Sequence, residues 1–547
     1  MQVHGLQFRP AYDMMQIPIK DHSVNLFHKN QFHRERGDFL FRQVLSATVV
    51  GLEVCPVSVE VDVSDGLPCF TMVGYVSAQV REAQDRVRTA LKNIGISMPP
   101  KRITVNLAPA DIRKEGAGFD LPIAVGILSA SGRILQSALE NVFFIGELGL
   151  NGEVRPVPGI LPMILMAVEK KIDLCIVPKA NLAEAKVIEE MNCLGVQNIE
   201  ELLDYFKYGE IPQEQQVMTP QIRQTYGVDF ADILGQEAAK RAALVAVSGF
   251  HNMLMVGPPG SGKTMLAQRI PTILPPMTRK ESLEVSKIYS VAGLLSKEQP
   301  LMGIRPFCDP HHTASPQALA GGGLVPKPGL ISLSHRGCLF LDEMPEFSRK
   351  SLEILRQPLE DRTITISRTS GTYTFPAHFL LLAAMNPCPC GCYPDLNRCT
   401  CTPAEIKKYR SKISFPLLDR IDITTNVSAV SYEELQEKGT GRVTSAQLRE
   451  QVEKVQNIQK NRYEKEGFLF NSELPASKVE TYCPMTPKAK DMMERVFQKL
   501  NLSARSYHRI LRVSRTIADL DEAKKIDISH ISEAIYYRGT ELYPEHE

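Results

Sequence analysis

The stretch "HNMLMVGPPGSGKTMLAQRI", residues 251 to 270, decides the fold class. It begins with an apolar run typical of a buried strand, continues into a glycine-rich loop and ends with the spacing of a helix. Such a loop lets successive backbone N–H groups point into one concavity at a helix N-terminus, where the helix dipole also favours phosphate. The stretch therefore predicts a P-loop that binds a nucleoside triphosphate, built on an α/β fold.

The loop "GPPGSGKT" supplies the groups that a bound triphosphate requires. We expect Lys263 to neutralise charge on the β- and γ-phosphates and Thr264 to hold Mg²⁺. ATP and Mg²⁺ are therefore the expected cofactors. The predicted nucleotide-binding residues are Gly257, Pro258, Pro259, Gly260, Ser261, Gly262, Lys263, Thr264 and Asp342.

Two further apolar runs end in polar side chains that belong beside this loop. "CLFLDEM", residues 338 to 344, ends in two carboxylates: we expect Asp342 to join the Mg²⁺ shell and Glu343 to polarise the attacking water. The run 379–385 ends at Asn386, whose amide can orient water or contact the γ-phosphate. A strand that ends in a charged turn is the plainer interpretation of 338–344, but the P-loop makes it the less favoured one.

Five cysteines crowd the next segment, "NPCPCGCYPDLNRCTC", residues 386 to 401. Two C-x-C pairs, Cys388 with Cys390 and Cys399 with Cys401, bracket a loop that can bring four thiolates around one tetrahedral Zn²⁺. Cys392 is then the spare thiol. A disulfide, unligated thiols or an iron–sulfur cluster are alternatives, although the other seven cysteines are scattered singly, as expected in a reducing cytosol.

The rest of the chain predicts several domains, because 547 residues exceed what one hydrophobic core usually supports. Residues 1–40 show little apolar spacing and are expected to form a disordered leader. Strand-like and helix-like segments alternate from 41 to 208 and predict an α+β domain. The remaining predicted parts are a polar, proline-punctuated linker (209–228), an ATPase core (229–430) with the cysteine-rich insert 388–401, and a helical C-terminal domain (431–547).

The bulk composition excludes two classes of protein. No apolar run approaches the roughly 18 residues of a membrane span, and no secretory signal is evident, so we expect a cytoplasmic protein without a membrane partner. The formal net charge of +1 gives no global basic field for nucleic acid. Any contact with DNA must therefore be local.

Several long motifs agree in order with one family. "DPHHTAS" (309–315), "LAGGGLVPKPGLISLSHRGCLFLDEMPEF" (319–347) and "PLLDRID" (416–422), together with the P-loop and "NPCPCG", resemble the magnesium-chelatase-like AAA+ ATPases of the ComM/YifB type. The resemblance covers nearly all of residues 41 to 547. It implies that Asn386 is sensor 1, that Arg420 is an arginine finger offered to a neighbouring subunit, and that Arg505 is the sensor 2 arginine of a helical lid. It also implies a homo-oligomeric ring, which we expect to be a hexamer.

The N-terminal domain resembles the proteolytic domain of Lon through "RKEGAGFDLPIA" (113–124) and "GELGLNGEVRPVPGI" (146–160). Catalysis of the Lon type needs a serine nucleophile and an activating lysine. Gly118 and Leu161 stand where that motif places the serine and the lysine, so we expect no peptidase activity. The domain is better interpreted as an oligomerisation or substrate-gating module.

Two features bear on a substrate. The segment "TITISRTSGTYTFPAHF" (363–379) predicts a hairpin turning around residues 369–371, which the resemblance places in the ring pore. Arg368 near its tip is expected to contact DNA phosphates without sequence preference, the alternative being an exposed turn with an incidental arginine. His311 and His312 are adjacent on a loop and seldom share a metal in that spacing, so a loop role of undefined chemistry is favoured.

Taken with the resemblance, these features predict an ATP-dependent ring motor acting on single-stranded or branched DNA, as a branch-migration helicase in recombination or natural transformation. A metallochelatase-type ATPase subunit or a chaperone-like AAA+ assembly factor is the alternative. A scaffold that only binds nucleotide is disfavoured, because Glu343 and Arg420 would serve no purpose in it.

Overall fold

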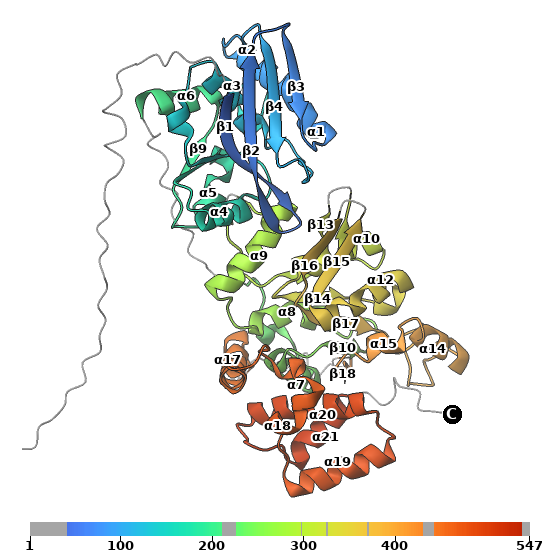
Figure 1. The fold of residues 1–547 in the computed structure, drawn as a ribbon. Helices are drawn as coiled ribbons and strands as arrows, with labels where there is room; N and C mark the ends of the chain where they lie inside the picture. The colour runs from blue at the N-terminus through green and yellow to red at the C-terminus, as the bar shows by residue number, and fades with distance from the viewer. Residues whose placement is uncertain are drawn as a thin grey trace, which may run out of the picture.

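The computed structural model describes residues 41–209, 226–296, 298–323, 326–368, 371–429 and 442–538. The predicted leader, most of the predicted linker and the hairpin tip at 369–370 lie outside these residues. Along the described chain, Figure 1 shows a large sheet with helices, a second sheet flanked by helices, and a group of helices at the C-terminal end. The mixed α/β class with a parallel sheet is confirmed. No helix among the described residues combines the length and apolar character needed to cross a membrane.

A seven-stranded mixed sheet organises the first part of the chain, in the order β3-β4-β2-β1-β5-β8-β9. Burial alternates along β2, where Val57, Val59 and Val61 are buried while the residues between them are not, because one face of the sheet covers the core. The strands are β1 (Phe41–Val50), β2 (Glu53–Ser64), β3 (Cys69–Val73), β4 (Arg102–Ala108), β5 (Val142–Phe144), β8 (Leu174–Pro178) and β9 (Cys193–Val196), with β6 (Glu147–Leu148) and β7 (Val154–Arg155) as a separate pair.

One buried helix packs on this sheet. Every residue of α3 is buried, and a methyl group at Gly126 would lie 2.5 Å from Val61, so the helix approaches β2 closely only because Gly126 has no side chain. Residues 78–93 form two helices that meet at Glu82. The helices are α1 (Ala78–Arg81), α2 (Ala83–Asn93), α3 (Asp120–Ala130), α4 (Ile160–Glu169), α5 (Leu182–Ala185) and α6 (Ile199–Tyr208).

The second sheet has five parallel strands in the order β11-β14-β17-β10-β18. All residues of β10, β14 and β17 are buried, as expected for a parallel sheet covered on both faces. The sequence predicted only these three strands. The complete set is β10 (Met253–Val256), β11 (Phe307–Cys308), β14 (Cys338–Leu341), β17 (Leu380–Met385) and β18 (Ile423–Asn426).

Because its strands are parallel, this sheet has all the carboxyl ends of its strands on one side, which we call the carboxyl edge, and all the amino ends on the opposite side, which we call the amino edge. The P-loop, Asp342 and Asn386 follow the carboxyl ends of β10, β14 and β17, whereas Asn252 and Asp422 precede the amino ends of β10 and β18. Strands of four to six residues separate the two edges by about 13–20 Å, at roughly 3.3 Å per residue.

Short helices and hairpins surround the second sheet (Figure 1). The predicted hairpin is present as an antiparallel pair in which Arg368 lies opposite Gly371. These elements are α7 (Glu237–Gly249), α8 (Lys263–Ile273), α9 (Arg279–Ala292), α10 (Pro316–Ala320), β12 (Gly321–Gly322), β13 (Lys327–Pro328), α11 (Leu330–Leu333), α12 (Arg349–Glu353), α13 (Pro358–Asp361), β15 (Thr363–Arg368), β16 (Gly371–Pro376), α14 (Pro403–Arg410) and α15 (Phe415–Leu418).

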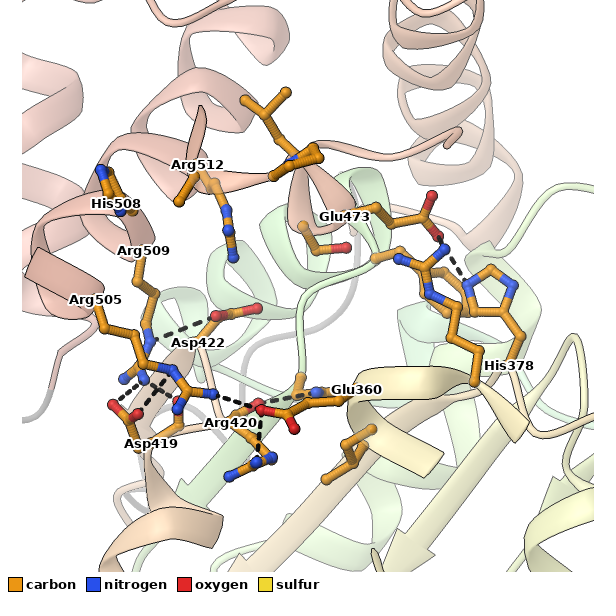
Figure 2. A pocket seen from close by; sticks show the side chains of 18 of the residues that line it. Glu360, His378, Asp419, Arg420, Asp422, Glu473, Arg505, His508, Arg509 and Arg512 are labelled. Atoms are coloured by element: carbon orange, nitrogen blue, oxygen red, sulfur yellow. Dashed lines mark hydrogen bonds and ion pairs between the residues drawn. The ribbon is translucent and has the colours of Figure 1, made fainter. Parts of the chain in front are cut away.

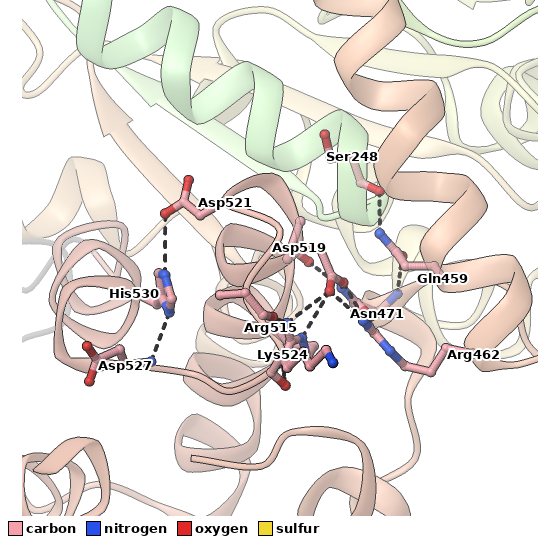
Figure 3. Close-up of polar contacts among 12 residues, drawn as sticks. Ser248, Gln459, Arg462, Asn471, Arg515, Asp519, Asp521, Lys524, Asp527 and His530 are labelled. Carbon is pink, nitrogen blue, oxygen red and sulfur yellow. Dashed lines mark hydrogen bonds and ion pairs between the residues drawn. The ribbon is translucent and has the colours of Figure 1, made fainter. Parts of the chain in front are cut away.

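A buried polar network fixes the C-terminal helices to the second sheet's helices (Figure 3). The Asp519 carboxylate accepts hydrogen bonds from Arg462, Arg515 and Asn471. The Gln459 amide donates to the Ser248 carbonyl on α7 and accepts from the Asn471 backbone. These helices are α17 (Ser445–Arg462), α18 (Val479–Tyr482), α19 (Pro487–Lys499), α20 (Ala504–Leu520) and α21 (Ile528–Tyr536).

Candidate active site

The P-loop joins β10 to α8 and holds its lysine in place. Gly262 begins α8 in the left-handed region, at φ 89°, which a glycine adopts without strain. The buried Lys263 Nζ donates to the carbonyls of Gly257 and Pro258 at 2.8 Å and to Oδ1 of Asn386 at 3.3 Å. Burial lowers the pKa of the Lys263 ammonium, while the carboxylates of Asp342 and Glu343 oppose that shift. The structure therefore brings Lys263 and Asn386 together from two neighbouring strands.

A hydroxyl and a carboxylate meet at the start of α8, where Mg²⁺ would be held. Thr264 Oγ1 donates to Oδ2 of Asp342 at 2.6 Å, and the Glu343 backbone N–H donates to Oδ1 of Asp342 at 2.9 Å. Hydroxyl and carboxylate oxygens are ligands that Mg²⁺ prefers, and the lysine and loop N–H groups suit phosphate. The residues present therefore fit Mg²⁺ and ATP.

Two residues without an assigned role lie beside these carboxylates. Strand β11 pairs in parallel with β14, so the residues that follow it emerge next to Asp342 and Glu343. Nδ1 of His312 lies 3.8 Å from Oε2 of Glu343. Burial, and then the nearby charge of Asp342, raise the pKa of Asp309. The available signal was the position of "DPHH" after an apolar pair, but a two-residue strand is too short to show periodicity.

The two predicted arginines lie at the other edge of the sheet. Arg420 Nη2 lies 2.5 Å, and Arg505 Nη2 3.1 Å, from the same oxygen of Glu360 (Figure 2). The hydrogen bond from Arg420 is the main reason that the pKa of Glu360 falls below its usual range. Arg505 also contacts Asp419 at 2.8 Å. The structure thus brings Arg420 and Arg505 together, but separates them from the P-loop of the same chain.

A cavity of about 680 Å³ opens at this edge between the second sheet and α20. Arg505, Arg509 and Arg512 of α20 all line it, and Nε of Arg512 is buried with no hydrogen-bond partner among the described residues. Figure 2 shows Arg512 beside Asp422. The sequence carried a usable signal for this cluster, because positions 505, 509 and 512 follow the helical spacing i, i+4, i+7.

The four cysteines of the two C-x-C pairs form one cluster. Sγ of Cys388 lies 3.4 Å from that of Cys390 and 3.7 Å from that of Cys399, and all four sulfurs, with Cys401, lie within 4.8 Å of one another. Ligands 2.3 Å from a tetrahedral Zn²⁺ would be about 3.8 Å apart. Backbone N–H groups, first that of Cys392, lower the pKa of Cys390 to about 5 and favour its thiolate. The cluster is therefore compatible with zinc.

The structure also gives the position of the fifth cysteine and bears on the alternative of a disulfide. Sγ of Cys392 contacts the Cys390 carbonyl and lies outside the cluster. All twelve cysteines are free, so the structure contains no disulfide among them. The cysteine loop lies against the P-loop, since a methyl at Gly391 would approach Cδ of Pro259 to 2.4 Å.

The two positions that the resemblance matches to a Lon-type serine and lysine, Gly118 and Leu161, are closely packed in the structure. A methyl at Gly118 would lie 2.8 Å from Cδ1 of Ile145. Leu161 is fully buried, and its backbone N–H donates to the Glu184 carboxylate at 3.0 Å. Ser290 of α9 donates to the same carboxylate at 2.5 Å, so the helix of the second sheet docks at this place.

Comparison with known proteins agrees with this arrangement. Three family models match the chain: "Magnesium chelatase, subunit ChlI" over residues 229–435, "Subunit ChlI of Mg-chelatase" over 59–181 and "Magnesium chelatase, subunit ChlI C-terminal" over 442–538. The chain is 44% identical to the competence protein ComM of Haemophilus influenzae, over 91% of this chain and 97% of that protein. It is 39% identical to YifB of Escherichia coli, over 91% and 96%. Lon protease 2 of Bacillus subtilis is 31% identical over 122 residues, which cover 22% of this chain and 21% of that protease.

Proposed function

This chain belongs to the ComM/YifB family of magnesium-chelatase-like AAA+ ATPases, and on that premise we propose that it is a ring motor that hydrolyses ATP to move DNA branches. The single observation that carries the proposal is the position of the arginines. Arg420 and Arg505 face a cavity at the amino edge of the sheet, while Lys263 and Glu343 lie at the carboxyl edge.

Each copy therefore supplies the P-loop half of one site and the arginine half of another. A head-to-tail contact between copies would bring the amino edge of one sheet to the P-loop of the next, and a rotation that closes such contacts generates a ring. We propose a hexamer in which Arg420 and Arg505 of one subunit stabilise charge on the phosphates bound by its neighbour. Glu360, which engages both arginines here, would then give way to a phosphate group as their anionic partner.

The residues at the carboxyl edge divide the hydrolytic work. Lys263 binds the phosphates, Glu343 accepts a proton from the attacking water, and Asn386 orients that water. Thr264 and Asp342 hold Mg²⁺, which supplies Lewis-acid stabilisation of phosphate charge when bound. A Zn²⁺ in the cluster of Cys388, Cys390, Cys399 and Cys401 would have a structural role, holding the cysteine loop against Pro259.

DNA contact is assigned to the β15–β16 hairpin. Arg368 is exposed and ends β15 next to the turn, so its guanidinium can bind phosphates without reading bases. A relative named as a competence protein supports a role with DNA taken up or recombined. The protein is expected to act in the cytoplasm, where such DNA is processed.

The test combines ATP turnover with and without DNA and strand separation of a synthetic four-way junction. The parent protein should hydrolyse ATP faster when DNA is present and should separate the strands of the junction. Lys263→Ala should lose nucleotide binding, whereas Glu343→Gln should bind ATP with Mg²⁺ but turn it over about 10²–10⁴-fold more slowly. If the rate of ATP turnover does not change when DNA is added and the junction strands do not separate, the protein is better explained as a metallochelatase-type ATPase subunit, which is what the matched family models name.

A further inference from the structure

Arg420, the arginine offered to the neighbouring copy, is held at its backbone as well as at its side chain. The side chain is only 10% exposed: Nη2 pairs with Glu360, and Nη1 donates to the Pro416 carbonyl at 2.5 Å. The backbone carbonyl of Arg420 accepts a hydrogen bond from Nδ2 of Asn252 at 2.9 Å. Asn252 is 168 residues away in the sequence and immediately precedes β10. A residue from another strand therefore fixes the point from which the guanidinium extends.

The Asn252 side chain uses both ends of its amide. Oδ1 accepts from the backbone N–H of Leu381 in β17 at 3.0 Å, while Nδ2 donates to Arg420. A backbone N–H only donates and a carbonyl only accepts, so these partners fix the orientation of the amide. A carboxylate or an apolar side chain of similar size cannot make both bonds. The position therefore uses the particular chemistry of asparagine.

Backbone contacts hold the same turn independently of that side chain. The Asn252 carbonyl accepts from the N–H groups of Asp422 and Ile423, each at 3.0 Å. Strand β10 also pairs in parallel with β17 and with β18. Removing the Asn252 side chain leaves these bonds in place, but it takes the side-chain donor from the Arg420 carbonyl. Such a substitution should displace Arg420 while the sheet remains intact.

We propose that Asn252 is a positioning residue for Arg420, and that it serves the active site of the neighbouring copy although it begins the strand that leads to its own P-loop. The inference rests on the proposed function, in which Arg420 acts on the nucleotide bound by that neighbour. Stabilising phosphate charge requires the guanidinium to stand at the correct place, and a displacement of about 1 Å can slow turnover roughly 10²-fold. Loss of the Asn252 side chain should therefore slow hydrolysis next door.

The first arm of the test separates kcat from KM for ATP. Asn252→Ala should lower kcat about 10- to 10²-fold and leave KM within about two-fold of the parent, because the P-loop is untouched. Asn252→Asp still accepts from Leu381 but places an oxygen against the Arg420 carbonyl, so it should lose at least as much kcat. This second variant also stands in for the first if Asn252→Ala does not fold.

A matched control lies in the first part of the chain. The Asn181 amide likewise bonds to the backbone in both directions, accepting from the Val157 N–H at 3.0 Å and donating to the Val157 carbonyl at 3.1 Å. Asn181→Ala should lower the melting temperature and keep the parent kcat. A loss of kcat shared by the control would mean that any lost amide contact slows turnover, and would contradict a specific role for Asn252.

The second arm uses mixed rings, formed by refolding two proteins together. Lys263→Ala copies supply only an arginine and Arg420→Ala copies supply only a P-loop, so each productive interface has a known donor of each half. Asn252→Ala added to the Lys263→Ala copies should lower the turnover of the mixed rings by the factor found in the first arm. Asn252→Ala added to the Arg420→Ala copies should leave that turnover unchanged.

The outcomes separate this inference from the proposed function. If Asn252→Ala or Asn252→Asp keeps the parent kcat, Asn252 does not position Arg420. If Asn252→Ala slows the mixed rings when it is carried by the Arg420→Ala copies, Asn252 acts through its own P-loop; the inference is then wrong and the shared site still stands. If mixed rings of Lys263→Ala and Arg420→Ala show no turnover at all, the shared site and this inference fall together.

Discussion

Asp519→Asn should loosen the packing of the C-terminal helices against one another, because Asp519 is the acceptor on which their polar network converges. Its carboxylate is only 1% exposed, and it accepts from Arg462 at 2.8 Å and 2.5 Å and from Asn471 at 2.9 Å. Arg515, whose side chain is 2% exposed, donates to it at 3.1 Å. The substitution keeps the volume but leaves two guanidinium groups without their counter-charge.

The expected cost follows from the burial of these charges. Breaking a buried pair by removing one partner costs about 3–5 kcal/mol, since the remaining charge stays uncompensated. With a urea dependence of about 1–2 kcal/mol per M for a domain of this size, a loss of about 3 kcal/mol lowers the unfolding midpoint by about 1.5–3 M. Far-UV circular dichroism of the helical transition in urea, with limited proteolysis as a second probe, measures this shift.

A matched control lies on the same helix as Arg462. Glu450 pairs with Lys454 at 2.9 Å, but these side chains are 67% and 63% exposed. Glu450→Gln should cost no more than about 0.5 kcal/mol, as is typical of exposed i, i+4 pairs. If Asp519→Asn unfolds at the same urea concentration as this control, the network of Figure 3 does not hold the helices in place.

Two further predictions concern the cysteine cluster and α9. Cys399→Ser should abolish the bound zinc measured by elemental analysis of the purified protein, whereas Cys392→Ser, outside the cluster, should retain it; equal zinc in both variants, or none in the parent, would remove the assignment. Glu284 of α9 pairs with His335 and Arg336, which lower its pKa from 4.5 to about 2. A carboxyl group whose pKa is lower in the folded than in the unfolded protein stabilises the fold at pH values above its unfolded pKa, and this stabilisation is lost as the pH falls through its folded pKa. The parent should therefore melt at a higher temperature than Glu284→Gln near neutral pH, and the difference should shrink toward about pH 3. A margin that does not change with pH would contradict the role of these ion pairs.

Local patterns in the sequence were sufficient for the parts of the site that lie on single elements. Residues 253–264 follow the strand, loop and helix order that the P-loop motif requires, and the apolar runs before Asp342 and Asn386 form β14 and β17. The hairpin also formed where alternation and turn residues predicted it, at β15 and β16. These features depend on periodicity and spacing, which a single sequence displays directly.

Features that depend on contacts between distant segments could not be predicted in this way. Glu360 meets Arg505 across 145 residues, and no local pattern marks either as the partner of the other. His312 reaches Glu343 only because β11 pairs with β14, and β11 has too few residues to be recognised. Strand β18 was missed because its residues, Ile423–Asn426, are largely polar.

Mixing two inactive variants tests most directly whether the active site is shared between copies. Lys263→Ala keeps Arg420 but loses phosphate binding, and Arg420→Ala keeps the P-loop but loses the guanidinium. Each variant alone should hydrolyse almost no ATP. When equal amounts are unfolded together, refolded and assembled, about a quarter of the interfaces in randomly mixed rings should pair an intact P-loop with an intact Arg420, and ATP turnover should recover to that extent. A mixture that stays as inactive as its components, or an Arg420→Ala protein that is fully active alone, would contradict the account.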